Sequence, residues 1–260
     1  MKILVGVPIY VGMGYCFKEF IEAISEIDYP NYDILLVDNS KTQTFFNELK
    51  NLEKTKRIKV LYDPTKEEKN YNRVCSSKQI IINYAKENNY DYILFMDADT
   101  IPPKNIIKEL LKWDKEVISG IYLRTEIKDG KNVEIPNAIK SISKETDQKE
   151  YKKFLEKSGM TEEELEKSLE EGNELFRPLS FYELYSDKLF EVIICSPGCM
   201  LISRKAFSSL NYKLYNQVEY DLPYLKGLRE KGFKIYCYPK VFCDHIIGKS
   251  KFPEGKYHLK

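Results

Sequence analysis

The sequence predicts an α/β fold built around a mostly parallel sheet with helices on its faces. First, short apolar runs alternate with segments of helical spacing over residues 3–62. Second, residues 92–96 form an apolar run that is typical of a strand covered on both faces. Third, strand-like sequence returns over residues 192–243, where the first predicted strand is Val192-Ile193-Ile194-Cys195. These observations indicate strands that are joined by right-handed helical crossovers.

The composition is that of a globular protein. The chain has 260 residues, of which 43% are hydrophobic and 31% are charged. A formal net charge of +1 argues against a general nucleic-acid-binding protein. No apolar run approaches the roughly 18 residues that span a bilayer, and the first run is too short for a signal peptide. We therefore expect a cytoplasmic protein. Its basic end, residues 249–260, could also contact a membrane surface.

The spacing of the six cysteines matches neither a zinc ribbon nor a redox motif. Most of them lie in or beside strand-like runs, which predicts buried thiols in a reducing compartment. They are Cys16, Cys75, Cys195, Cys199, Cys237 and Cys243.

The first part of the chain alternates strand and helix. Residues 3–7, 33–37 and 58–62 predict strands, and residues 17–24 and 45–52 predict the helices between them.

The glycines that follow the first strand do not form a nucleotide-binding fingerprint. Gly12 and Gly14 form part of a turn, but Phe17 occupies the position of the third glycine in G-x-G-x-x-G. No P-loop is present either. A phosphate ligand would therefore need a cation in place of a glycine cradle.

The central feature of the sequence is a pair of acids at the end of the strand 92–96. Alternation along an extended chain predicts that Asp97 and Asp99 point to the same side. Like charges held so close are costly unless a cation or hydrogen-bond donors offset them. Ligands of open α/β sheets bind at the carboxyl ends of strands. The pair could hold a divalent ion and through it a diphosphate, or it could serve a turn or a helix N-cap.

The rest of the chain divides into three parts. Residues 126–187 predict a solvated helical insert, in which residues 144–171 are dominated by Lys and Glu. The insert has a hairpin turn at Asp129-Gly130 and a capping box at Thr161. The insert could instead be an acceptor lid or a partner surface. Residues 188–248 return to strands and include a helix that stops at Gly232. Residues 249–260 form the basic tail.

Several short motifs, taken in order, resemble the inverting, metal-dependent glycosyltransferases of the GT-A fold, the family-2-like group. The resemblance covers most of the chain except residues 126–187. It rests on Pro8-Ile9-Tyr10, Asp38, Lys78-Gln79 with Ala85, Asp97-Ala98-Asp99, Val117-Ile118-Ser119-Gly120 and the glycine-plus-strand segment Gly198–Arg204. The family often has Arg-Asn where this chain has Lys78-Gln79. The resemblance implies a nucleotide-sugar-binding half over residues 1–125 and an acceptor-side half over residues 188–248.

The catalytic base departs from the family pattern. The family often places Glu-Asp eleven residues before the glycine that ends the next helix, and this spacing falls on Asp221. Tyr220 replaces the preceding Glu, and Glu219 lies one residue further back. The resemblance implies Asp221 as the base, with Glu219 as a substitute. Asp221 could also merely cap its helix, and a carboxylate there would stay ionised.

The resemblance also implies the other site residues. Asp99 and His245 would hold Mn²⁺ or Mg²⁺, with Asp97 contributing through water or through sugar hydroxyls. Lys78 would add a cation at the diphosphate, and Gly198 would lie beneath the acceptor. Pro8 and Tyr10 would border the nucleotide base, and Asp38 would bind the base or the ribose.

The implied activity is transfer of a sugar from a UDP- or GDP-sugar to a hydroxyl of a glycan, lipid or protein acceptor. A sugar-phosphate nucleotidyltransferase and a non-catalytic nucleotide-sugar-binding protein are the alternatives. The first usually has a glycine-rich basic loop near its N-terminus, which this sequence lacks. Because Tyr220 replaces the Glu of the family pattern, a non-catalytic nucleotide-sugar-binding protein remains an alternative.

Overall fold

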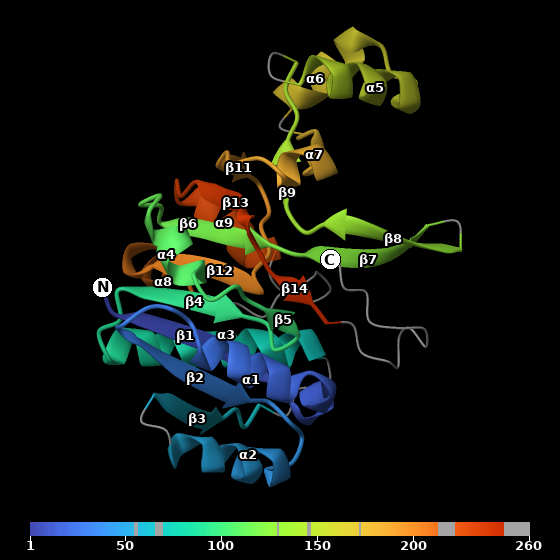
Figure 1. Ribbon diagram of the computed structural model, residues 1–260. Coiled ribbons are helices and arrows are strands. Elements are labelled where there is room, and N and C mark those ends of the chain that lie inside the picture. Colours follow the sequence, from blue (N-terminus) through green and yellow to red (C-terminus); the bar gives the residue numbers. More distant parts are fainter. Residues whose placement is uncertain are drawn as a thin grey trace.

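An eight-stranded sheet forms the centre of the computed structural model of this chain (Figure 1). The structure describes residues 1–54, 57–65, 70–128, 130–144, 147–171, 173–212 and 222–246. The strands of the central sheet are β1 Ile3–Ile9, β2 Tyr32–Asp38, β3 Ile58–Tyr62, β4 Tyr92–Met96, β6 Val117–Ile121, β11 Phe190–Val192, β12 Cys199–Ser203 and β13 Ile235–Phe242. Their order across the sheet is β11-β13-β6-β12-β4-β1-β2-β3.

The sheet is mixed and mostly parallel. Strand β1 pairs in parallel with β2 and β4, and β2 pairs in parallel with β3. Strand β12 runs antiparallel between β4 and β6, and β13 is again parallel to β6. The edge strand β11 is antiparallel to β13. The predicted β-α-β-α-β order and the mostly parallel sheet are therefore confirmed.

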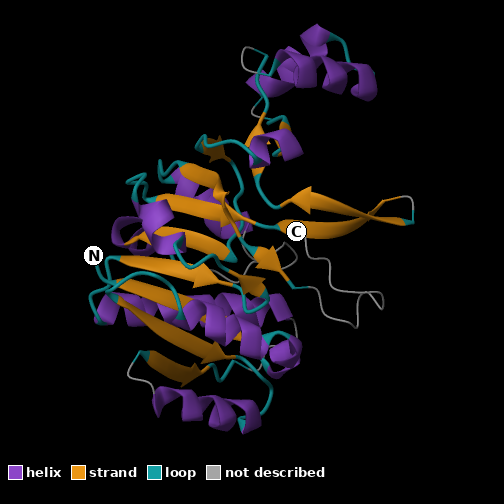
Figure 2. Cartoon of the chain, viewed as in Figure 1, coloured by secondary structure: helices purple, strands orange, loops and turns teal. Residues whose placement is uncertain are grey.

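Helices cover both faces of the sheet (Figure 2). Because side chains alternate along a strand, Ile3, Val5 and Val7 pack on one face, and Leu4 packs on the other. The first face is covered by α1 Phe17–Ser25, α2 Thr44–Leu49 and α4 Ile106–Leu111. The second is covered by α3 Asn70–Glu87, α8 Arg204–Ser209 and α9 Leu222–Glu230.

Three elements of the structure begin or end at residues other than those predicted from the sequence. The helix expected over residues 45–52 is divided into α2 and the 3₁₀ helix η2 Lys50–Lys54. The glycine turn after β1 is the 3₁₀ helix η1 Val11–Tyr15. The strand expected to reach Cys195 ends at Val192, because the backbone of Ile193 and Ile194 pairs with Ile139 instead of with β13.

The insert contains strands as well as the predicted helices. Its elements are β7 Leu123–Lys128, β8 Lys131–Pro136, β9 Ile139–Ser141, α5 Gln148–Ser158, α6 Glu162–Glu170, β10 Phe176–Pro178 and α7 Phe181–Leu184. Strands β7 and β8 form the predicted hairpin, and Gly130 has a φ of 71°, which favours glycine. Asp129 lies outside the described residues. Thr161 makes the predicted capping box with Glu164.

Helices α5 and α6 lie at the end of the insert that is far from the sheet (Figures 1 and 2). They enclose a small core of their own, which consists of Ile142, Tyr151, Leu165 and Leu175. Nearer the sheet, the Arg177 guanidinium forms an ion pair with Glu183 at 2.6 Å, and both side chains are less than one fifth exposed. The insert is therefore held together by its own contacts.

All six cysteines are buried and none forms a disulfide, as predicted. None of the helices in the described ranges is long and apolar enough to cross a membrane. The basic tail, residues 249–260, lies outside the described part of the chain.

Candidate active site

The carboxyl ends of β1, β2 and β4 lie side by side, and the predicted nucleotide-binding residues gather there. Pro8 is buried within β1 opposite Val37 of β2. Tyr10 follows the strand and is 37% exposed. Its ring lies directly over Gly12, where a Cβ atom would be 2.2 Å from Tyr10 Cε2. Gly12 therefore allows the ring to fold back over the turn.

Asp38 ends β2 and is completely buried. Its Oδ1 accepts hydrogen bonds from the Ser40 N–H at 3.0 Å and the Ser40 hydroxyl at 2.6 Å. Its Oδ2 is buried and accepts no hydrogen bond from the described residues. Burial raises the pKa of the Asp38 carboxyl, although the bonds from Ser40 oppose this. A buried acceptor oxygen without a donor is suited to an N–H or O–H group of a ligand.

A second buried carboxylate, Asp63 after β3, was not predicted. Its N–H donates to the Asp38 carbonyl at 2.8 Å, and its side chain accepts from the Ser76 and Ser77 hydroxyls at 3.0 and 2.9 Å. Ser77 also accepts from the Asn39 amide at 3.1 Å. This network ties the ends of β2 and β3 to α3. An acid directly after the third strand, as after the second, was the signal in the sequence.

Lys78 lies on α3 and is completely buried. Its Nζ is 5.8 Å from the centroid of the Phe95 ring and 5.6 Å from that of Tyr212. Such rings favour a cation, and the contact with Phe95 places the amino group between α3 and β4.

The Asp-x-Asp segment lies in a turn. Strand β4 ends at Met96, and the Thr100 N–H donates to the Asp97 carbonyl at 3.0 Å. The strand predicted over residues 92–96 is therefore confirmed, but the extended chain does not continue to Asp99, because the chain turns to enter β5 Thr100–Ile101. Both carboxylates are half-buried, and both contribute to the raised pKa of His245.

Gly198 meets Asp97 across the turn. The Asp97 N–H donates to the Gly198 carbonyl at 3.1 Å. A Cβ atom on Gly198 would be 2.3 Å from Asp97 Oδ2, a distance at which one of them must move. Asp97 can therefore adopt this position only beside a residue without a side chain.

The structure brings His245 to Asp99. Strand β14 Asp244–His245 pairs with β5 so that His245 is opposite Thr100. This register places His245 Nε2 3.6 Å from Asp99 Oδ2. The Nδ1–H donates to the Leu123 carbonyl at 3.2 Å, which leaves Nε2 directed toward the acid. Burial lowers the pKa of His245, but Asp99 and Asp97 outweigh it and raise the pKa above its ordinary value.

Three further residues border this pair and were not predicted. The Tyr15 hydroxyl lies 3.4 Å from Asp99 Oδ2. The Cys16 thiol donates to the Ala98 carbonyl at 3.3 Å, and burial and Asp99 raise its pKa to about 11. The Tyr122 ring lies 5.0 Å from the His245 ring. None of the three belongs to a motif, so only the folded chain could identify them.

The predicted base lies outside the described residues. Glu219 and Asp221 both fall in residues 213–221, for which the structure gives no description. The residues on either side are well packed, since the rings of Tyr212 and Tyr224 stack with centroids 4.0 Å apart.

Asp99 and His245 could supply two ligands of a metal site. Among the described residues, no group of three or more His, Cys, Asp or Glu side chains is arranged to hold an ion. A carboxylate oxygen and an imidazole nitrogen nevertheless suit Mn²⁺ or Mg²⁺. Neighbouring ligand atoms of an octahedral ion at about 2.1 Å lie about 3.0 Å apart, so the 3.6 Å found here would have to shorten when an ion binds. Water and an anionic substrate could supply the remaining ligands.

Comparison with known proteins finds a family that is similar to most of this chain. The sequence model described as Glycosyl transferase family 2 matches residues 5–210. The match contains every predicted site residue up to Gly198 and ends before Glu219, Asp221 and His245. No match to a curated protein reaches significance at the level of sequence alone.

Solved structures of similar fold include two glycosyltransferases. The structure of S. aureus TarS residues 1–349 with UDP has 13% identity and a TM-score of 0.52, and the alignment covers 97% of this chain and 62% of that one. The structure of TarS with UDP-GlcNAc has 12% identity and a TM-score of 0.52, and its alignment covers 95% of this chain and 60% of that one. The structure of GalNAc-T7 with UDP, GalNAc and Mn²⁺ has 14% identity and a TM-score of 0.60, and its alignment covers 95% of this chain and 44% of that one. The chain thus spans less than two thirds of each of these structures.

Proposed function

The chain belongs to glycosyl transferase family 2, and on that premise we propose that it transfers a sugar from a nucleoside-diphosphate sugar to an acceptor hydroxyl. The observation that carries this proposal is the pairing of Asp99 with His245 at the carboxyl end of β4. Ligands of open α/β sheets bind at this end. The six buried thiols support the cytoplasmic location that we propose, because disulfides are rare in reducing compartments.

Asp99 and His245 would hold Mn²⁺ or Mg²⁺, with Asp97 close enough to contribute through water. A bound divalent ion would supply positive charge where the leaving diphosphate becomes more negative. The protein contributes the orientation of both ligands. The Leu123 carbonyl fixes the His245 ring, and Gly198 leaves room for the Asp97 carboxylate.

The nucleotide would lie across the ends of β1 and β2. Tyr10 is exposed and can stack on the base, while Pro8 shapes the end of its strand. Asp38 Oδ2 would accept an N–H or O–H donor of the base or ribose, which would satisfy this buried oxygen. Lys78 would add positive charge beneath the diphosphate. The TarS and GalNAc-T7 structures contain UDP or UDP-GlcNAc, which favours a uridine donor.

The acceptor would lie near Gly198, and Asp221 would remove its proton. Attack from the face opposite the leaving group would invert the anomeric carbon. Glu219 is the substitute base if Asp221 only caps α9. Asp221 immediately precedes α9 in the sequence, and a carboxylate at a helix N-terminus stays ionised, as a base must.

A thermal-shift panel tests the proposal. Nucleoside diphosphates, sugar nucleotides and nucleoside triphosphates are each added with Mn²⁺, with Mg²⁺ and with a chelator. We expect a UDP- or GDP-sugar to raise the unfolding temperature, and the chelator to remove most of the effect. Stabilisation by a triphosphate with a sugar phosphate, with release of pyrophosphate, would indicate a nucleotidyltransferase instead. No stabilisation by any sugar nucleotide would contradict the proposal.

A further inference from the structure

A long groove runs between α9 and the insert. Its volume is about 1500 Å³, which exceeds the roughly 300–1,000 Å³ typical of pockets for small molecules. On the α9 side it is lined by Leu222, Pro223 and Lys226, and on the insert side by Asn173 and Phe176. Leu222 directly follows the proposed base Asp221 in the sequence. The groove therefore runs along α9 from its first residue, Leu222, to its last, Glu230, and reaches the insert at Asn173.

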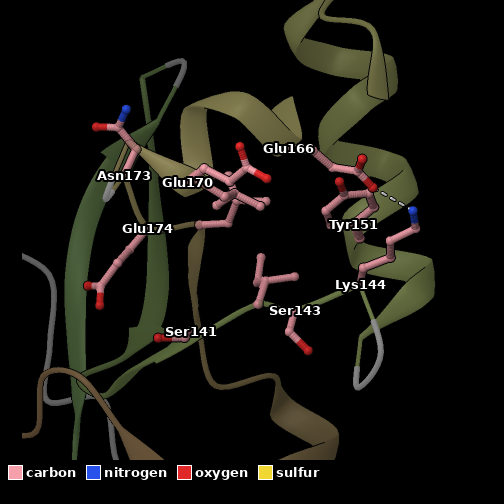
Figure 3. Close-up of a pocket in the computed structure, with 11 residues that line it drawn as sticks. Ser141, Ser143, Lys144, Tyr151, Glu166, Glu170, Asn173 and Glu174 are labelled. Atoms are coloured by element: carbon pink, nitrogen blue, oxygen red, sulfur yellow. Dashed lines mark hydrogen bonds and ion pairs between the residues drawn. The ribbon is translucent and has the colours of Figure 1, made fainter. Parts of the chain in front are cut away.

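A second pocket adjoins the groove within the insert (Figure 3). It has a volume of about 460 Å³ and lies beside α5 and α6. Ser141, Asn173 and Glu174 line both the pocket and the groove. Figure 3 shows the Lys144–Glu166 ion pair at one end of the pocket and Asn173 and Glu174 at the other. The two hollows thus lie next to each other at these three residues.

The groove is lined by balanced charge. Its charged side chains among the described residues form three ion pairs: Glu174 with Arg229 at 2.6 Å, Glu191 with Lys234 at 2.8 Å, and Lys226 with Glu230 at 4.0 Å. A groove built to bind a polyanion would instead present an excess of unpaired positive charge. The lining therefore favours an occupant without net charge.

The groove combines an exposed ring with hydrogen-bonding groups. Phe176 is 60% exposed, and its backbone pairs with that of Ser141 across β9 and β10, so ring and hydroxyl share one wall. Asn173 adds an amide on the same side. Sugar rings present apolar C–H faces and hydroxyl edges, which match an aromatic face beside polar side chains.

We propose that the groove and the adjoining pocket bind the distal units of an extended, uncharged oligosaccharide or polysaccharide acceptor. This inference rests on the proposed glycosyl transfer and names the class of its acceptor. The first sugar units would lie near the start of α9, and further units would follow the groove past Phe176 toward Asn173. Affinity should therefore increase with the length of the acceptor.

The test compares Phe176→Ala and Asn173→Ala with Tyr182→Ala. Tyr182 is 89% exposed and lies in the same insert, but it does not line the groove. The probes are uncharged gluco-oligosaccharides, N-acetylated chito-oligosaccharides and manno-oligosaccharides of two to eight units, together with polygalacturonate, chitosan oligomers and a peptide array. Binding of each probe and of UDP with Mn²⁺ is measured for every variant, along with the unfolding temperature.

We expect at least one uncharged series to bind with affinity that increases with chain length. Phe176→Ala should weaken this binding about tenfold, a loss typical of one stacking contact. Tyr182→Ala should leave it unchanged, and all three variants should bind UDP equally. Binding of only the charged probes or peptides, equal effects of Phe176→Ala and Tyr182→Ala, or no glycan binding at all would overturn the inference. Failure of UDP to bind would instead contradict the proposed function.

Discussion

The backbone of Gly198 touches the carboxylate of Asp97, so that a methyl group on Gly198 would lie 2.3 Å from Asp97 Oδ2. This contact joins the antiparallel strand β12 to the Asp-x-Asp turn at the end of β4. It makes the position of one acid depend on the absence of a side chain more than 100 residues away in the sequence.

Gly198→Ala should displace the Asp97 carboxylate and weaken both stability and nucleotide binding. Overpacking of this kind typically costs about 1–3 kcal/mol of unfolding free energy. Denaturant unfolding and UDP titration with Mn²⁺ measure the two effects. Gly14→Ala is the matched control, because a methyl group on Gly14 would meet no atom within 4 Å beyond its chain neighbours. Equal behaviour of the two variants would show that Asp97 accommodates the methyl group at no cost.

Asp99→Ala should abolish the metal-dependent part of nucleotide binding, because the ion would lose its carboxylate. His245→Ala should weaken metal binding by at least the roughly 10–100-fold typical of losing an outer-shell group. Calorimetry of UDP binding with and without Mn²⁺ measures both losses. Asp244→Ala is the control, since this exposed acid precedes His245 in β14. If Asp99→Ala bound UDP with the same dependence on Mn²⁺, the assignment of the ligand would be wrong.

Asp221→Asn should retain sugar-nucleotide binding and lose most of the transfer. General-base catalysis typically contributes about 10²–10⁴-fold, so a loss of that size in turnover is expected. The comparison with Glu219→Gln identifies the base, because only the residue that accepts the proton should show this loss. Unchanged turnover in Asp221→Asn with a large loss in Glu219→Gln would transfer the role to Glu219.

The insert should lose stability in acid. Burial alone would raise the pKa of Glu183, but the Arg177 guanidinium and the Ser180 donors lower it to about 2. The ordinary glutamate pKa is about 4.3, so the stabilising contribution of Glu183 is complete above that pH and is lost as the pH falls toward 2. Hydrogen exchange of the amides of β10 and α7 between pH 6 and pH 3 measures this change.

Glu183→Gln should remove most of that pH dependence and destabilise the insert at neutral pH, because Arg177 would lose its charged partner. Glu163→Gln, an exposed change on α6, serves as the control. An identical pH profile in wild type and Glu183→Gln would mean that another group is responsible.

The family and the fold were predictable because local sequence determines them. The apolar runs 3–7, 33–37 and 92–96 are strands, and the motifs that follow them have the order of the family that matches residues 5–210. The capping box at Thr161 and the hairpin at Gly130 were predictable for the same reason, since each depends on a few adjacent residues.

Contacts between distant strands were not predictable. The antiparallel insertion of β12 between β4 and β6 brings Gly198 to Asp97, and no pattern along the chain indicates it. Tyr15 likewise reaches the site only through the packing of separate elements. The neighbourhood of His245 was expected only by resemblance, and its 3.6 Å approach to Asp99 depends on the register of β14 with β5.

The most direct test of the account is a crystal structure of the protein with Mn²⁺ and UDP, with data collected at the manganese absorption edge. The account predicts an anomalous peak that lies within about 2.0–2.4 Å of both an Asp99 oxygen and His245 Nε2 and contacts the diphosphate. UDP bound elsewhere, or bound at this edge with no peak between Asp99 and His245, would contradict it.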